Sequence, residues 1–129
     1  MRIFDASSFY LVIKEQRLDL LPNSYFLSLT QYELGNVIWK EVKLKKGISE
    51  SEALTVMEFF IHQMLKMKMT HLDSMQTLKT AFQLKLNYYD ASYICAARSL
   101  GLPLIKEDKV LKAHSIDYIY VFSISEISK

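Results

Sequence analysis

The sequence predicts an α/β fold with a largely parallel sheet. Short apolar stretches typical of strands alternate along the chain with longer stretches of helical periodicity. A chain of 129 residues has the length of one domain and can bury roughly two-thirds of its unfolded surface. Half of the residues are hydrophobic and 23% are charged, which excludes collagen-like, low-complexity and disordered chains. We therefore expect residues 1–129 to form a single domain.

Five short strands are expected from the apolar runs. The first ends at Asp5, and the fourth follows the helix-stopping sequence Gly101-Leu102-Pro103. The second follows a turn over residues 20–24. The predicted strands span residues 1–4, 25–29, 67–71, 104–105 and 117–122.

Six helices are expected between these strands. Ser49 and Glu52 form a capping box, Asp73 and Gln76 form a similar signal, and Thr30 is a candidate N-cap. Lysines followed by Gly47 mark the end of the second helix. The predicted helices span residues 7–15, 30–44, 49–65, 73–86, 89–100 and 108–114.

Charge and cysteine usage favour a cytoplasmic protein. The single cysteine, Cys95, cannot form an internal disulfide and is typical of a reducing compartment. Asp5 interrupts any apolar signal-peptide segment, and the uncharged runs are too short to span a membrane. We therefore expect no membrane association.

The net charge of +2 is too small to indicate nucleic-acid binding by itself.

Acidic residues stand where the predicted elements change type. Asp5 ends the first strand, while Asp90 and Asp108 open helices, and Glu33 lies in the first turn of its helix. In open α/β sheets, ligands bind beyond the carboxyl ends of the strands. Taken one at a time, Asp5, Asp90 and Asp108 could each be helix N-caps, and Glu33 could be a partner of the helix dipole. A functional site requires that the four converge.

Convergence of these acids would require a cation. Two carboxylates about 4 Å apart repel by about 4 kcal/mol at an effective dielectric near 20. Several carboxylates in one pocket stay ionised only if a positive charge offsets them. Oxygen ligands without His or Cys suit Mg²⁺ or Mn²⁺, ions that activate water and stabilise charge on phosphates. The natural substrate of such a site is a phosphodiester.

Four motifs in this order resemble those of the PIN-domain nucleases, and in particular the VapC-type toxins of prokaryotic toxin–antitoxin pairs. The motifs are Asp5-Ala6-Ser7, Glu33-Leu34-Gly35-Asn36, Tyr89-Asp90-Ala91-Ser92-Tyr93 and Leu104-Ile105-Lys106-Glu107-Asp108. The resemblance covers essentially the whole chain, and the segment from residue 89 to residue 108 is its most specific part. It implies a three-layer α/β/α sandwich with a mainly parallel sheet.

The resemblance also implies a site, a cofactor and partners. Asp5, Glu33, Asp90 and Asp108 match the family's catalytic acids, and Asp5, Asp90 and Asp108 would hold Mg²⁺ or Mn²⁺. Ser7 matches the small polar residue that follows the first acid, so it is a candidate substrate contact. The implied partners are RNA, a VapB-like antitoxin protein and a second copy of the chain in a homodimer.

One position departs from the family pattern. The family commonly has Thr or Ser two residues before the last acid, where this chain has Lys106. Positions two apart in an extended segment point the same way, so Lys106 should face the pocket with Asp108 while Glu107 points away. Lys106 either pairs with Asp108 and competes with a metal, or binds the RNA phosphate as a point charge. It is therefore a second candidate substrate contact.

Two functions follow, from different classes. The first is a Mg²⁺- or Mn²⁺-dependent endoribonuclease that acts as the toxin of a toxin–antitoxin pair. The alternative is a catalytically weak or inactive PIN-like module that binds RNA or protein, with Lys106 in the metal's place. A phosphatase or phosphoacceptor domain is disfavoured, because a dehalogenase-like site would need a second Asp where Ser7 stands.

The end of the second predicted helix is rich in lysine. These residues could form a rim for an RNA backbone or simply a solvated surface. They are Lys40, Lys43, Lys45 and Lys46.

Overall fold

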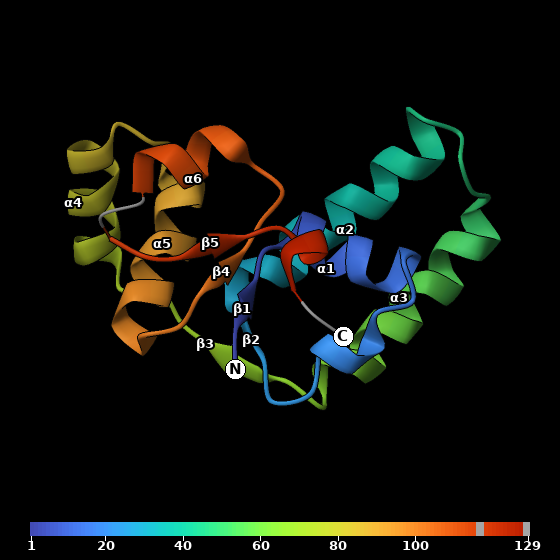
Figure 1. Cartoon of the computed structure of the whole chain (residues 1–129). Coiled ribbons are helices and arrows are strands. Elements are labelled where there is room, and N and C mark those ends of the chain that lie inside the picture. The colour runs from blue at the N-terminus through green and yellow to red at the C-terminus, as the bar shows by residue number, and fades with distance from the viewer. Residues whose placement is uncertain (116–117, 128–129) are drawn as a thin grey trace.

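A parallel five-stranded sheet lies between two groups of helices (Figure 1). The computed structural model describes residues 1–115 and 118–127. The strand order is β3-β2-β1-β4-β5, and every neighbouring pair is parallel. The predicted α/β class with a parallel central sheet is confirmed. The strands are β1 (Ile3–Phe4), β2 (Tyr25–Leu27), β3 (Lys68–Thr70), β4 (Leu104–Ile105) and β5 (Val121–Phe122).

The helices form the two outer layers. Helices α1, α2 and α3 lie on one side of the sheet, and α4, α5 and α6 lie on the other (Figure 1). Each corresponds to a helix predicted from the sequence, with ends shifted by a few residues. Their bounds are α1 (Ala6–Lys14), α2 (Ser28–Lys43), α3 (Glu50–Met64), α4 (Ser74–Leu84), α5 (Tyr88–Leu100) and α6 (Lys109–Ser115). Two short 3-10 turns, η1 (Leu18–Leu20) and η2 (Ile124–Glu126), complete the described elements.

Successive strand residues point to opposite faces of the sheet, and both faces are buried. On the side of α1–α3, the core receives one residue from each of four strands: Phe4, Phe26, Ile105 and Phe122. On the side of α4–α6, the same strands contribute Ile3, Leu27, Leu104 and Val121. This alternation decides toward which helical layer each residue just beyond a strand end will point.

The helix N-caps predicted from the sequence are only partly correct. The capping box of Ser49 and Glu52 and the cap at Asp73 are both present. The prediction that Thr30 is an N-cap is wrong, since α2 already begins at Ser28. Instead, the buried Thr30 hydroxyl accepts a hydrogen bond from the backbone N–H of Leu27 across 3.1 Å.

The C-terminal strand is shorter than predicted. Of the stretch 117–122, only Val121–Phe122 forms β5, and Asp117 lies outside the described residues. Within the part of the chain that the structure describes, no helix has both the length and the apolar character needed to cross a membrane.

Candidate active site

The register of β1 against β4 brings Asp5 and Lys106 together. Ile3 pairs with Leu104 and Phe4 with Ile105, so the next positions along the two strands are Asp5 and Lys106. Both continue the face that carries Ile3 and Leu104, the face toward α5. Their side chains meet in an ion pair, with Lys106 Nζ 2.7 Å from Asp5 Oδ2.

Both carboxylate oxygens of Asp5 have partners. Oδ1 accepts a hydrogen bond from the backbone N–H of Ser8 across 2.9 Å, which makes Asp5 the N-cap of α1. Oδ2 accepts from Lys106. The Asp5 side chain is 5% exposed, so its charge depends on these two donors. Asp5 is therefore the N-cap of α1, as one alternative had it, and its second oxygen also binds the Lys106 ammonium.

Asp90 approaches the same ammonium group from α5. Its Oδ1 lies 3.5 Å from Lys106 Nζ. The N-cap of α5 is Asn87, whose Oδ1 accepts from the backbone N–H of Asp90 across 2.8 Å. The alternative of Asp90 as an N-cap is therefore wrong, and its carboxylate is available to the site.

Lys106 is a buried cation among acids. Burial lowers the pKa of the Lys106 ammonium, but the nearby carboxylates of Asp5, Asp90 and Asp108 raise it, and the net pKa lies above its usual value. Glu107 points away as expected, and its Oε1 accepts from the backbone N–H of Ile124 across 2.7 Å. The ion pairs formed by Lys106 are with Asp5 and Asp90, rather than with Asp108 as one sequence-based alternative had it.

Glu33 is held by a chain of hydrogen bonds that crosses to α5. The Tyr93 hydroxyl donates to Glu33 Oε1 across 2.6 Å. Because this uses the only hydroxyl hydrogen of Tyr93, the Thr30 hydroxyl donates to the Tyr93 oxygen, 2.8 Å away. The backbone N–H of Leu27 completes the chain at Thr30. Burial raises the pKa of Glu33, the hydrogen bond from Tyr93 opposes the rise, and the charge of Asp5 adds to it.

Asp5, Glu33 and Lys106 line one cavity of about 200 Å³. The exposed Ser7 is part of its wall, so the predicted substrate contact does border the acids.

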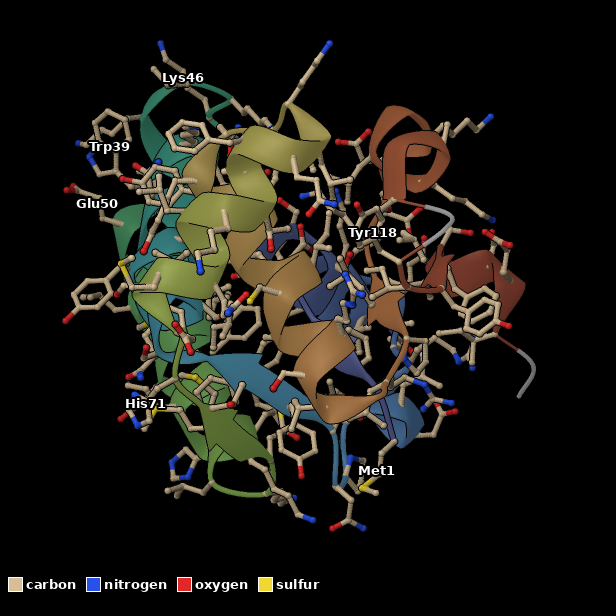
Figure 2. The ribbon with its side chains drawn as sticks, turned by 90° about the vertical axis from the view of Figure 1, so that its left-hand side faces the viewer. Met1, Trp39, Lys46, Glu50, His71 and Tyr118 are labelled. Atoms are coloured by element: carbon tan, nitrogen blue, oxygen red, sulfur yellow. The ribbon has the colours of Figure 1, made fainter. Side chains whose placement is uncertain are left out.

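Of the lysines at the end of α2, Lys40 lines this cavity. Lys43 and Lys45 pair with Glu50 and Glu41. Lys46 lies at the outer edge of the molecule, along which Trp39 and Glu50 also lie (Figure 2).

Asp108 lies beside this cavity rather than in it. Its Oδ1 accepts from the backbone N–H of Leu111 across 2.9 Å, so it caps α6 as the structural alternative proposed. It lines a neighbouring cavity of about 480 Å³ together with Lys109 and Lys112. Lys106 belongs to the walls of both cavities. The structure thus places Asp5 and Glu33 in one cavity, Asp90 beside the same Lys106 ammonium, and Asp108 in the neighbouring cavity.

The donor chemistry fits a hard divalent cation, but the present arrangement holds a different one. Among the side chains that the structure describes, no three from His, Cys, Asp or Glu are placed so that they could hold a metal ion. The position between Asp5 and Asp90 contains the Lys106 ammonium instead. Two carboxylates, those of Asp5 and Asp90, nevertheless approach this one cation position, and carboxylate oxygens are the ligands that Mg²⁺ and Mn²⁺ prefer.

The sequence alone did not indicate that Tyr93 and Thr30 support Glu33. A signal was present, because Thr30 precedes Glu33 by three residues and Tyr93 follows Asp90 by three. In helices, such spacing places side chains on one face. The contact between the two helices depends on the tertiary fold, which the spacing alone does not give.

Comparisons with known proteins agree with this fold. The family model for the PIN domain matches residues 2–116. The chain is 34% identical over 87 residues to Exonuclease VapC9 of Pyrobaculum aerophilum, a match that covers 67% of this chain and 63% of that relative's length.

Solved structures are also similar. The crystal structure of PAE2754 from Pyrobaculum aerophilum has a TM-score of 0.77 and 26% identity, covering 93% of this chain and 87% of that one. VapBC-1 from nontypeable Haemophilus influenzae has a TM-score of 0.64 and 16% identity, covering 97% of this chain and 98% of that one. A toxin–antitoxin complex from Klebsiella pneumoniae has a TM-score of 0.56 and 16% identity, covering 84% and 87%. The last two show the fold alone. With its family-model match over residues 2–116, the chain belongs to the PIN domain family.

Proposed function

We propose that this protein is a Mg²⁺- or Mn²⁺-dependent nuclease that hydrolyses RNA phosphodiesters. The observation that carries this proposal is the approach of Asp5 and Asp90, from two different elements, to one cation at the carboxyl end of the sheet. The name of the curated relative, an exonuclease, supports nuclease chemistry. We propose that cleavage is endonucleolytic, as the resemblance to VapC-type toxins implied. The cleavage experiment below distinguishes this from exonucleolytic cleavage.

Each residue of the site has a proposed role. Asp5, Asp90 and Asp108 would hold the ion, which when bound supplies positive charge to activate water and to stabilise the phosphate. Glu33, oriented by Tyr93, accepts a proton from the attacking water. Ser7 and Lys106, which border the cavity, contact the substrate.

We further propose that the chain is the cytoplasmic toxin of a toxin–antitoxin pair and forms a homodimer. The names of the relative, a VapC, and of the neighbouring toxin–antitoxin structures support this partner class. Large apolar side chains that could meet a partner are exposed on α3 and α4. They include Leu54, Ile61, Met75, Leu78 and Phe82.

Cleavage of defined RNAs tests the nuclease. A linear end-labelled RNA pool and a circular RNA are incubated with Mn²⁺ and the full chain, the Asp5→Asn variant, or the full chain with EDTA. We expect the wild type to cut both RNAs, and the variant and the chelated enzyme to cut neither. Asn still caps α1, so Asp5→Asn should fold, which circular dichroism checks. Cutting of the linear RNA alone would identify an exonuclease, and unchanged cutting by Asp5→Asn would overturn the assignment.

A second candidate is a module that binds RNA or protein without turnover. The observation that favours it is the ion pair of Lys106 with Asp5, in which a protein cation stands where the proposed mechanism would require a divalent ion. RNA binding that does not depend on Mn²⁺, by a folded wild type that cuts no RNA, would support this function over the first.

A further inference from the structure

The position between Asp5 and Asp90 already contains a cation that belongs to the chain. We propose that the Lys106 ammonium is a built-in competitor for the divalent ion. It holds the cation position in the RNA-free protein, and a divalent ion binds there only when the ammonium leaves. This inference rests on the proposed function, because it concerns the ion which that function requires.

Asp5 makes the competition direct. Its Oδ1 is committed to the backbone N–H of Ser8 at the start of α1. The oxygen that can turn toward an ion is Oδ2, and Lys106 Nζ lies 2.7 Å from it. An ion bound to this oxygen and the ammonium would therefore occupy nearly the same place.

The positive charge of the Lys106 ammonium weakens the binding of a divalent ion. Lys106 and a divalent ion repel each other and share the same carboxylates. The Lys106 side chain is 16% exposed and that of Asp5 is 5% exposed, so little water is present to screen them. Removal of the ammonium both ends the repulsion and frees the carboxylates of Asp5 and Asp90.

The Lys106 ammonium has a second position available in the neighbouring cavity. Lys106 lines the cavity of Asp5 and also the neighbouring cavity of Asp108. A lysine stem with four carbons can swing between two such positions. In the second position the ammonium faces a cavity that Asp108 and Glu126 line together with Lys109 and Lys112, so carboxylates are present there as well.

The test measures Mn²⁺ binding to the RNA-free full chain by isothermal titration calorimetry, so it does not depend on activity. We expect Lys106→Thr to bind Mn²⁺ at least about tenfold more tightly than the wild type. Lys106→Arg keeps the positive charge and should bind as weakly as the wild type. The matched control is Lys40→Gln, which removes a charge from the same cavity and should change the affinity by less than about threefold.

Two results would overturn the proposal. One is a Lys106→Thr protein that binds Mn²⁺ no more tightly than the wild type. The other is a Lys40→Gln protein whose affinity rises as much as that of Lys106→Thr, since general charge would then explain the effect. If Lys106→Thr does not fold, Lys106→Gln takes its place, because its amide can still donate to Asp5, and the same increase is expected.

Failure of this proposal differs from failure of the proposed function. A wild type that cuts RNA while Lys106→Thr and the wild type share one Mn²⁺ affinity would reject the competition and keep the nuclease. A wild type that cuts no RNA while Lys106→Thr binds Mn²⁺ more tightly would keep the competition and reject the nuclease.

Discussion

Asp5 and Lys106 are the first residues beyond the paired positions of β1 and β4, and their side chains form an ion pair of 2.7 Å. The pair is nearly buried, and Asp5 also caps α1. One carboxylate therefore contributes to the start of a helix, to a buried ion pair and to the proposed catalytic site. Substitutions at this pair should change stability as well as activity.

Loss of the Lys106 charge should destabilise the metal-free protein. We expect Lys106→Thr in EDTA to lower the free energy of unfolding by about 3 kcal/mol, because it leaves Asp5 charged and buried without its cation. Urea denaturation measures this. Mn²⁺ should then raise the melting temperature of the variant more than that of the wild type, because the ion binds only the folded state.

The control for this substitution is Lys112→Thr. Lys112 forms an ion pair with Glu126 on the surface, where both side chains are 42% exposed. Loss of such a pair should cost less than about 1 kcal/mol. Equal losses for the two variants would contradict the buried character of the pair of Asp5 and Lys106.

Tyr93→Phe should weaken both the fold and the placement of Glu33. The variant loses the donor to Glu33 and leaves the buried Thr30 hydroxyl without its acceptor. We expect a loss of about 1–3 kcal/mol in the free energy of unfolding and a lower maximal rate of RNA cleavage with little change in RNA affinity. Tyr89→Phe on the same helix, at an exposed position, should change neither. Wild-type kinetics in Tyr93→Phe would show that Glu33 needs no such support.

Glu33 should reduce stability at neutral pH. Burial is the largest cause of its raised pKa, so the folded chain keeps a proton on Glu33 at pH values where the unfolded chain has lost it. Stability therefore falls as the pH rises from the ordinary glutamate value through the raised one, and the penalty is complete above both. Glu33→Gln removes the penalty.

The Glu33→Gln protein should thus be more stable than the wild type at pH 7. The difference should shrink as the pH falls from above the raised pKa to the ordinary value of 4.5, and it should change little below that value. Thermal denaturation across this range measures it, with Glu58→Gln at an exposed position of α3 as the control. A difference that is constant with pH would contradict the raised pKa.

The fold could be predicted from local signals because they agree with one another. Apolar runs, the capping box at Ser49 and the stop at Gly101 each follow from nearest neighbours in the chain, and the structure has the corresponding elements. The boundary of α2 was wrong because Thr30 resembles an N-cap in sequence. Its hydroxyl is instead used at the third position of the helix.

The site could be predicted only in part. Its residues stand at the ends of elements, which the sequence reveals, and Lys106 does face the cavity. Its partner could not be predicted, since the alternation within one segment pointed to Asp108. The register between β1 and β4, set by contacts far apart in sequence, determines that the partner is Asp5. For the same reason, the contact of Tyr93 with Glu33 became visible only in the folded chain.

The central strand β1 has β2 on one side and β4 on the other. Asp5 is synthesised 101 positions before its partner Lys106. A nascent chain that ends before β4 therefore has α1 and its cap without the ion pair. The proposed site can therefore assemble only after β4 has left the ribosome and paired with β1. Formation of the proposed site is thus delayed relative to the synthesis of its first acid.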